Sequence, residues 1–327
     1  MTLKHIAELA GVSVPTVSKA FSGSKEISEE TRRKIFEIAR EKGCFDKYNK
    51  NKYNKMVIAV ICPEIISDYY ATILRLLEEE IAKNAGLMII SCTNFSPSKE
   101  EEFFNYYSSY CRADGILLIN NRKEIKNAHM IPAVSLSPSV NSPNIDTIEI
   151  DPTDAVGEAI RHLKAFGHTK IGYAGEPLTL GAEQRFRAAM ERAGLLVEEE
   201  LVCTGNQRFE EAGIEIVEQW MKRGNWPTAI LAAYDYIAIG IIKGFRNHGL
   251  RVPEDISVVG MNDISIIPYL DPPLSTVKSF SEEACRAAVE LLMRKIKNPY
   301  YVNHEQILFK GEFVARGSVA PRKDVKR

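Results

Sequence analysis

Apolar positions near the start of the chain recur every three or four residues, which is the period of amphipathic helices. Ile6 belongs to an apolar stripe that ends at Gly11, where a helix end favours a residue free to adopt positive φ. Ser13 is placed to cap a second helix, and Pro15 follows in its first turn, where a missing N–H costs nothing. Residues 2–21 therefore predict two short helices joined by a tight turn.

A third amphipathic helix is predicted between Ser28 and Gly43. Ser28 is a good N-cap, and the two glutamates that follow it favour the positive end of the helix. Residues 1–55 carry twelve Lys and Arg against seven Asp and Glu, whereas the whole chain has a net charge of −1, so residues 56–327 carry −6. This asymmetry favours nucleic acid as the partner of the first part of the chain.

The exposed face of the second predicted helix carries Thr16, Ser18 and Lys19. Short polar and cationic side chains are the groups that base edges and phosphates accept. An ordinary amphipathic helix pair has the same periodicity, so the pattern of this segment alone leaves that alternative open.

From residue 56 onward, short apolar runs alternate with longer amphipathic stretches. The strand-like runs are Val57–Ile61, Leu87–Cys92, Gly115–Ile119, Ala133–Leu136, Thr147–Ile150, Lys170–Ala174, Ala229–Ala233 and Ser257–Val259. Helix-like stretches lie near 70–84, 98–110, 153–166, 181–193, 209–223 and 235–247. Because consecutive positions are apolar, the strands are expected to be covered on both faces, as in mainly parallel sheets. The length of the region predicts two doubly wound α/β sheets, with ligands at the carboxyl ends of the strands.

Composition adds few candidates for chemistry. The six cysteines, at positions 44, 62, 92, 111, 203 and 285, show no metal-site spacing, so we expect reduced thiols and no metal. No phosphate loop, dinucleotide fingerprint or hydrolase motif is present, and His162 and His168 are expected at a helix surface and its end rather than as catalytic bases. We therefore expect no enzyme activity and no cofactor. The run Met56–Cys62 is too short to span a bilayer and no export leader precedes it, so a cytoplasmic protein without a membrane partner is expected.

These motifs, taken in order, resemble the lactose-repressor (LacI/GalR) family of bacterial transcription regulators. The resemblance is carried by residues 6–13, 16–19 and 28–32, and further along by Gly167-His168, Val252–Gly260 and Pro272–Val277. It covers essentially the whole chain. It implies an all-α helix-turn-helix headpiece over 1–45, a basic linker over 46–55, and a two-lobed core over 56–327 like that of periplasmic binding proteins.

The resemblance also implies that the chain crosses between the two subdomains three times. We place these crossings near Asp151, Val277–Ser281 and Gly311. The first subdomain would then comprise about 56–151 and 281–310, and the second about 152–280 and 311–327. The helix 281–296 would return to the first subdomain, and Phe313–Val319 would close the second.

Members of this family bind near-palindromic operators as dimers, with the second helix in the major groove. By that docking mode, Thr16 and Lys19 face base edges, and Val14 and Pro15 lie at the leading end of the helix. The residues expected on phosphates are Lys4, Ser13, Ser18 and Ser28.

The linker departs from the family pattern, because residues 44–55, CFDKYNKNKYNK, lack the proline and the leucine of the usual hinge helix. Its cations, which suit phosphate contacts, are Lys47, Lys50, Lys52 and Lys55. Asparagines and lysines disfavour a stable free helix, so a flexible basic tether is expected. The alternative is that Tyr48 or Tyr53 acts as a wedge in the minor groove.

The ligand cleft of the family is altered at several positions. Ala182 replaces the usual arginine, and Ser137, Tyr234 and Asn262 replace other polar groups that hold sugar hydroxyls. Arg185, one helical turn after Ala182, either turns into the cleft or lies on an outer face. The residues we expect at the effector are Tyr69, Tyr70, Ser137, Arg185, Tyr234, Asp235, Asn262 and Asp263. Rim tyrosines and helix-capping acids are the alternatives for several of them.

A cleft rich in rings predicts a ligand with a flat or apolar face rather than a neutral hexose, and an inward Arg185 would add an anionic group. The function predicted is a homodimeric, effector-controlled DNA-binding repressor, with a tetramer left open. Its partners would be a double-stranded DNA operator and an unidentified small-molecule effector. The alternatives are a solute-binding module of periplasmic type, or a regulator controlled by a non-sugar ligand or a protein partner.

Overall fold

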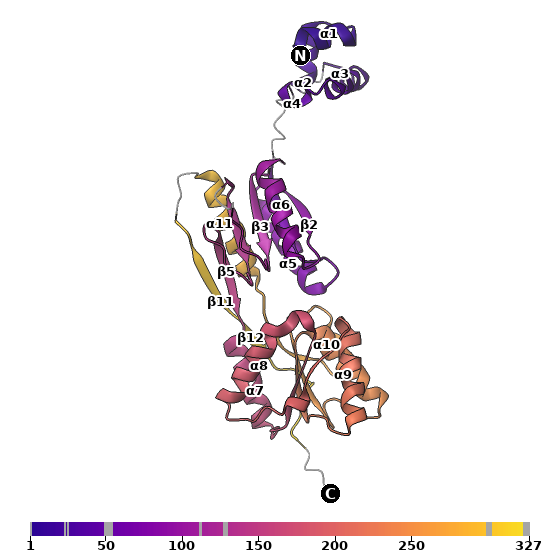
Figure 1. Cartoon of the computed structure of the whole chain (residues 1–327), viewed down its shortest axis with the longest axis vertical. Helices are drawn as coiled ribbons and strands as arrows, with labels where there is room; N and C mark the ends of the chain where they lie inside the picture. The colour runs from indigo at the N-terminus through magenta and orange to yellow at the C-terminus, as the bar shows by residue number, and fades with distance from the viewer. Residues whose placement is uncertain are drawn as a thin grey trace. The chain divides into compact units, whose positions relative to one another are not determined.

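The computed structural model describes residues 2–22, 24, 26–48, 55–110, 113–126, 130–298 and 303–322. It divides into two compact units, residues 1–56 and 57–327, whose elements are labelled in Figure 1. The fold class predicted from the sequence, a helical headpiece and two mainly parallel α/β sheets, is confirmed.

The first unit contains the helices α1 (Leu3–Ala10), α2 (Val14–Phe21), α3 (Glu29–Glu41) and α4 (Phe45–Tyr48). Gly11 ends α1 with a φ of 70°. Ser13 Oγ caps α2 by accepting the backbone N–H of Thr16 at 3.2 Å, and Ser28 Oγ caps α3 by accepting that of Thr31 at 3.2 Å. The predicted helix starts are therefore confirmed, with the capping chemistry that the sequence indicates.

The helical unit continues beyond residue 46, where the linker was predicted to begin, because α4 extends to Tyr48. The rings of Phe45 and Tyr48 both lie 5.9 Å from that of Phe21, and Phe45 meets Phe36 edge-on at 5.0 Å. These rings pack against the cluster that contains Ile6. The boundary at residue 45 is therefore corrected, because aromatic side chains of the expected linker complete the headpiece core.

The first lobe of the core is a six-stranded sheet of order β11-β5-β4-β3-β1-β2. Its strands are β1 (Met56–Cys62), β2 (Gly86–Cys92), β3 (Gly115–Ile119), β4 (Ala133–Leu136), β5 (Asp146–Asp151) and β11 (Gln306–Lys310). The pairs β1–β3, β3–β4, β4–β5 and β5–β11 are parallel. The lobe's helices are α5 (Asp68–Lys83), α6 (Pro97–Ser109) and α11 (Glu282–Lys297). Phe104 of α6 is buried against Ala59 and Ile116, and α11 packs on β3, β4, β5 and α5.

The second lobe is a six-stranded sheet of order β12-β10-β9-β8-β6-β7. Its strands are β6 (Ile171–Gly175), β7 (Val202–Thr204), β8 (Ala229–Ala232), β9 (Ser257–Met261), β10 (Ser275–Lys278) and β12 (Glu312–Val314). Its α-helices are α7 (Thr153–Ala165), α8 (Leu180–Arg192), α9 (Phe209–Arg223) and α10 (Asp235–Asn247). Only the β10–β12 pair is antiparallel among the pairs of this sheet. Figure 1 shows α7 with α8 and α9 with α10 as two pairs that flank the sheet.

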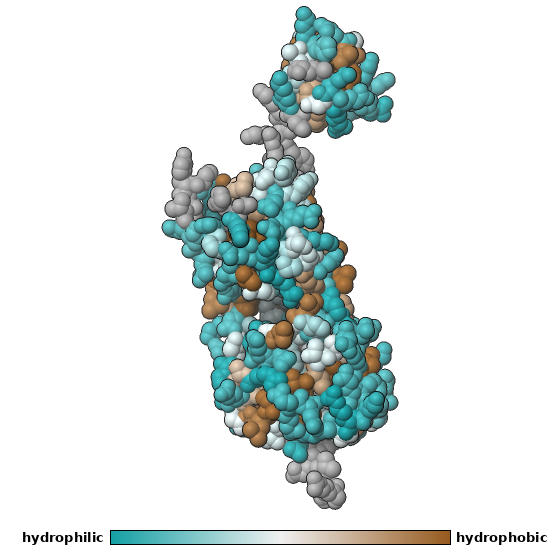
Figure 2. Space-filling model, in the orientation of Figure 1, coloured by the Kyte–Doolittle hydropathy of each residue, from teal (hydrophilic) through white to brown (hydrophobic). Residues whose placement is uncertain are grey.

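The chain passes between the two sheets three times. β5 leads into α7, β10 leads into α11, and β11 is followed after Gly311 by β12. A Cβ at Gly311 would lie 2.9 Å from the carbonyl oxygen of Lys278, so two of these passages run close together. No helix among the described residues is long and apolar enough to cross a membrane. Figure 2 shows a face on which hydrophilic residues prevail and hydrophobic ones form small, separate groups.

Candidate functional site

The exposed face of α2 is the candidate DNA-binding surface. Val14, Pro15, Ser18 and Lys19 are exposed, whereas Thr16 is half-buried. The hydroxyl of Thr16 lies 2.8 Å from Ser13 Oγ. The two serines that cap α2 and α3, and Lys4 on α1, are also exposed.

Lys19 forms an ion pair with Glu26, and about half of the lysine side chain is exposed. An exposed pair of this kind contributes little to stability, because water screens it. The ammonium of Lys19 is therefore available to an acceptor on DNA at little energetic cost.

The linker residues differ in what the structure shows. Tyr48 was predicted as a possible wedge, but its ring packs on Phe21 in the headpiece core, so we no longer assign it to the minor groove. Lys47 is exposed, with Nζ 5.3 Å from the centre of the Tyr48 ring. Lys50, Lys52 and Tyr53 lie outside the described residues.

The second candidate site is a cleft between the two lobes of the core. It consists of two adjoining cavities, one of about 600 Å³ and a larger, more open one of about 1690 Å³. The residues that line both are Tyr69, Asn120, Arg122, Leu178, Thr179 and Asn262. They come from loops that follow strands or from the start of the next helix, which is where doubly wound sheets bind ligands.

The smaller cavity is lined by aromatic side chains from both lobes. They are Tyr69, Tyr70, Phe95, Phe209, Tyr234 and Tyr236. The Tyr69 and Tyr70 rings meet edge-on at 5.1 Å, and Phe209 meets Tyr236 in the same way at 5.4 Å. Burial raises the pKa of Tyr70 to about 12, so its hydroxyl stays protonated. The predicted ring-rich cleft is thus present at Tyr69, Tyr70 and Tyr234.

Close packing of α9 on α10 positions part of this aromatic wall. A Cβ at Gly213 of α9 would lie 2.2 Å from the carbonyl oxygen of Ile237, and one at Gly240 of α10 would lie 2.0 Å from that of Glu210. Only glycine allows the two backbones to approach so closely. The approach brings the first residue of α9 next to the N-cap of α10, where the N–H of Phe209 donates to the Tyr234 hydroxyl at 3.1 Å.

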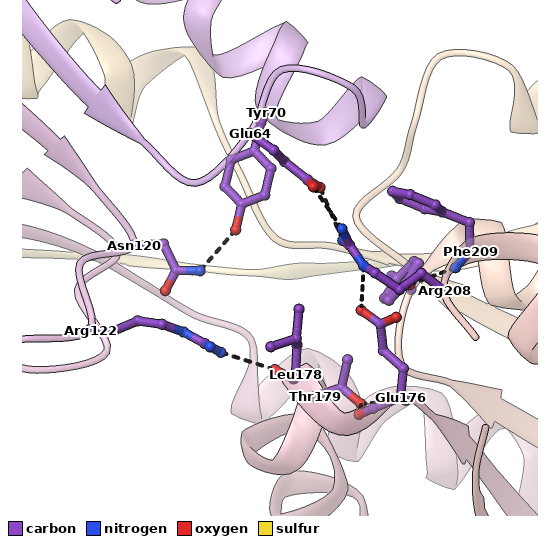
Figure 3. Close-up of polar contacts among 10 residues, drawn as sticks. Glu64, Tyr70, Asn120, Arg122, Glu176, Leu178, Thr179, Arg208 and Phe209 are labelled. Carbon is purple, nitrogen blue, oxygen red and sulfur yellow. Dashed lines mark hydrogen bonds and ion pairs between the residues drawn. The ribbon is translucent and has the colours of Figure 1, made fainter. Parts of the chain in front are cut away.

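An ion-pair network crosses the cleft inside the smaller cavity (Figure 3). Arg208 of the second lobe donates to both carboxylate oxygens of Glu64 in the first lobe, at 2.8 and 3.1 Å. Its Nε also donates to Glu176 at 3.4 Å. The bonds to Glu64 raise the pKa of Arg208 above its usual value, while burial raises the pKa of Glu176. The chain thus fills part of its own cleft with a bidentate ion pair.

Further polar contacts join the lobes. Asp68 at the start of α5 accepts from the backbone N–H of Ser265 at 3.0 Å and from its hydroxyl at 3.1 Å. Arg122 donates to the carbonyl oxygen of Leu178 at 3.4 Å. Figure 3 shows the Arg122 and Arg208 side chains entering the cleft from opposite lobes. These contacts link the two lobes across the cleft.

Three other predicted residues line the larger cavity. They are Ser137, Arg185 and Asn262. Arg185 therefore faces the cleft rather than an outer surface. Asn262 accepts a 2.6 Å hydrogen bond from the Ser279 hydroxyl.

The two acids predicted at the effector have partners within the protein. Asp235 is fully buried beneath the smaller cavity, where it accepts from the Thr276 hydroxyl at 2.7 Å and the Ile264 N–H at 2.9 Å. Burial raises its pKa to about 7. Asp263 forms an ion pair of 2.6 Å with Arg316. Both side chains support the cleft from beneath or beside it, so we no longer assign them to direct contact with a ligand.

Several cleft residues were not predicted from the sequence. They are Glu64, Phe95, Asn120, Arg122, Glu176 and Arg208. Each follows the carboxyl end of a strand, a rule that would have found most of them. Arg208 follows β7, a three-residue strand that the sequence pattern did not reveal.

Comparison with known proteins places the two units in characterised families. Residues 2–43 match the model of bacterial regulatory proteins of the lacI family, and residues 160–319 match that of a periplasmic binding protein-like domain. The chain is 30% identical over 332 residues to the HTH-type transcriptional repressor CytR of Escherichia coli, covering 97% of this chain and 96% of that protein. It is also 30% identical over 345 residues to the HTH-type transcriptional regulator DegA of Bacillus subtilis, covering 98% of each.

Solved structures of the same fold include three with full-length coverage. A transcriptional regulator from Silicibacter pomeroyi matches with a TM-score of 0.73 and 22% identity, over 98% of this chain and 100% of that one. The cellobiose complex of the regulator CelR matches with a TM-score of 0.69 and 24% identity, over 97% of this chain and 99% of that one. The lac repressor dimer bound to operator and an anti-inducer matches with a TM-score of 0.67 and 21% identity, over 98% of this chain and 99% of that one.

Proposed function

The chain belongs to the lacI family of bacterial regulatory proteins, and from this premise we propose how it binds DNA and senses a ligand. It is a DNA-binding transcriptional regulator, as its relatives are. In our proposal α2 binds the major groove of an operator, and a small molecule in the cleft between the lobes controls that binding. The observation that supports this most directly is the pairing, in one chain, of an exposed, correctly capped α2 with a cleft lined by both lobes.

For DNA, we propose that Thr16 and Lys19 contact base edges, with Val14 and Pro15 leading into the groove. The exposure of this face supports the assignment. A homodimer on a near-palindromic operator follows from the docking mode of such headpieces.

For the ligand, we propose that it occupies the joined cavities and favours one relative orientation of the lobes. A ligand shifts such an equilibrium only by its differential affinity for the two orientations. The proposed contact residues are Tyr69, Tyr70, Ser137, Arg185, Tyr234 and Asn262, which all line one cavity or the other.

The test of the DNA assignment is a selection of binding sites from random DNA, followed by affinity measurements on the selected site. Lys19→Ala should weaken binding by roughly 1–3 kcal/mol and relax preference at one base position. Lys34→Ala is the matched control, because it removes the same charge from an exposed position on α3. It should leave base preference intact. Unchanged affinity and base preference for Lys19→Ala would refute the assignment.

A further inference from the structure

One cation in the cleft lacks the partners that its neighbours have. The side chain of Arg185 is partly buried at the wall of the larger cavity, and its Nε has no hydrogen-bond partner among the described residues. Among the described residues, the groups that act on its charge do so only from a distance, and no carboxylate hydrogen-bonds to it. Burial lowers its pKa, with Asp151 acting against that shift as a nearby negative charge. A guanidinium held in this way is expensive to bury without a counter-ion.

The contrast with Arg187, two residues along the same helix, is direct. Arg187 donates to both oxygens of Glu199, at 2.7 and 2.8 Å, and to Glu183 at 2.9 Å. The same residue type on α8 is therefore fully paired where it faces away from the cleft. Arg185 is unpaired where it faces the cavity, which is the arrangement expected if a ligand supplies its anion.

Other groups around this cavity suit an anion. Arg122 lines it as a second guanidinium and makes one side-chain hydrogen bond of 3.4 Å, to a backbone carbonyl oxygen. The hydroxyl-bearing residues Ser137, Thr179 and Ser279 line the same space. No acid among the described lining residues of this cavity other than Glu149 opposes the two cations.

The adjoining aromatic cavity defines the rest of the ligand. It opens to the larger cavity at Tyr69 and Asn262, so a molecule held at Arg185 can place a ring among the aromatic side chains. At its far wall, Glu176 Oε2 is buried and has no partner at hydrogen-bond distance among the described residues, although the Tyr234 hydroxyl is near enough to lower the pKa of this carboxyl. That oxygen is an acceptor for an N–H or O–H of the ligand.

We propose that Arg185 forms an anion subsite, and that the effector is an acidic small molecule. Its carboxylate or phosphate binds Arg185, and its unsaturated ring, with an N–H or O–H donor, occupies the aromatic cavity. This inference rests on the proposed control of DNA binding by a cleft ligand, and it specifies the chemical class of that ligand.

The first experiment uses inorganic phosphate and measures thermal unfolding of the full-length protein in phosphate or chloride at equal ionic strength. Phosphate should raise the Tm of wild type and of Arg187→Met more than that of Arg185→Met. The difference in Tm should be roughly 2–4 °C for each tenfold by which the phosphate concentration exceeds Kd. Without phosphate, Arg185→Met should be at least as stable as wild type, because an unpaired guanidinium is removed. Arg185→Lys should keep part of the phosphate response, since it keeps the charge but loses the planar fork.

An equal phosphate response in wild type and Arg185→Met overturns the proposal. So does a clear loss of stability in phosphate-free Arg185→Met that Arg185→Lys does not share, since that would indicate a structural cation.

The second experiment uses calorimetry with matched neutral and anionic pairs. The pairs are 4-hydroxybenzamide and 4-hydroxybenzoate, adenosine and its 5′-monophosphate, and glucose and its 6-phosphate. They separate carboxylate from phosphate and aromatic from saturated rings. A ring-bearing anion should bind at least tenfold more tightly than its neutral partner, and Arg185→Met, but not Arg187→Met, should abolish that preference. Micromolar binding of glucose that lowers operator affinity contradicts the proposal.

Operator binding by the ligand-free protein is measured on the same samples. If the protein binds its operator but its ligand is neutral, or binds equally well to Arg185→Met, only the anion subsite is overturned. Absence of sequence-specific operator binding overturns the proposed function itself.

Discussion

Replacing Arg208 with methionine should destabilise the core far more than the same replacement at Arg187. Each arginine donates to both oxygens of one glutamate and also to a second glutamate. The difference lies in the acids. The side chains of Glu64 and Glu176 are 7% and 2% exposed, whereas those of Glu199 and Glu183 are 73% and 21% exposed. The two variants therefore remove the same kind of contacts, once from buried acids and once from more solvent-exposed acids.

The magnitude follows from that exposure. Removing one partner of a fully buried ion pair costs about 3–5 kcal/mol, because the remaining charge stays buried and unpaired. The Arg208 side chain is 35% exposed, so some water already reaches the pair, and we expect roughly 2–3 kcal/mol at pH 7.5. For Arg187→Met we expect a much smaller loss, because water screens the exposed Glu199 pair and only Glu183 is partly buried.

The loss in Arg208→Met should also depend on pH, and its sign follows from Glu176. Burial already raises the pKa of this carboxyl, and Arg208 is the main group that lowers it. Without the arginine the folded-state pKa rises further above the unfolded value. Protonation below that pKa removes the unpaired charge, so the loss of stability relative to wild type should shrink as the pH falls towards 4.5.

Urea unfolding at pH 4.5 and 7.5 measures both effects. Trp220 is fully buried, and both tryptophans of the chain belong to the second lobe, so fluorescence follows that lobe while circular dichroism follows the whole chain. Glu64→Gln should lose less stability than Arg208→Met, because Arg208 retains its hydrogen bond to Glu176 in that variant. Equal losses for Arg208→Met and Arg187→Met, or a loss for Arg208→Met that does not change with pH, would refute the reasoning.

Two further predictions concern single side chains. Burial raises the pKa of Asp235 to about 7, so its contribution to stability is present below about pH 4 and is lost as the pH rises through 7. In urea titrations, the free energy of unfolding of wild type minus that of Asp235→Asn should fall by up to about 1.4 kcal/mol per pH unit over that window. A difference that stays constant with pH would contradict a buried, protonated Asp235. Ser28→Ala removes the cap on Thr31 N–H and should lower headpiece stability by about 1 kcal/mol in amide hydrogen exchange, whereas Ser18→Ala, in the middle of α2, should be neutral or slightly stabilising.

Much of the fold was predictable because local physics determines it. Serine caps, a glycine with positive φ and helical apolar stripes specify the headpiece helices within a few residues. Most of the eight predicted strands are continuous apolar runs buried on both faces, whereas β2 (Gly86–Cys92) is an edge strand without a fully buried residue. The strands that were missed lack this signal. β11 (Gln306–Lys310) is an edge strand with alternate burial. β10 (Ser275–Lys278) is polar where it is buried: the backbone N–H of Ser275 donates to Ser318 Oγ, and the Thr276 hydroxyl donates to Asp235.

The cleft was predictable in composition but not in connectivity. The sequence indicated rings at Tyr69, Tyr70 and Tyr234, which follow from local position. It did not reveal that Glu64 and Arg208, 144 residues apart, would meet across the lobes. Nor did it show that Asp235 turns inward to Thr276. The Glu64–Arg208 pair depends on how the two lobes face each other, and the Asp235–Thr276 bond depends on how α10 packs beside β10 within the second lobe. No local pattern encodes either arrangement.

The contacts that the protein already makes across its cleft limit what a ligand has to supply. The Glu64–Arg208 pair and the Asp68–Ser265 bonds hold the lobes together without help, so a ligand that merely repeats such contacts adds little preference for closure. A shift of the equilibrium requires interactions that exist only with ligand bound. Among the described residues that line the cleft, Nε of Arg185 and Oε2 of Glu176 have no partner at hydrogen-bond distance, although the Tyr234 hydroxyl lies near the Glu176 carboxyl. Both groups belong to the second lobe, so a ligand that satisfies them favours one arrangement of the lobes only if it also contacts first-lobe residues that line the two cavities, such as Tyr69 and Asn120.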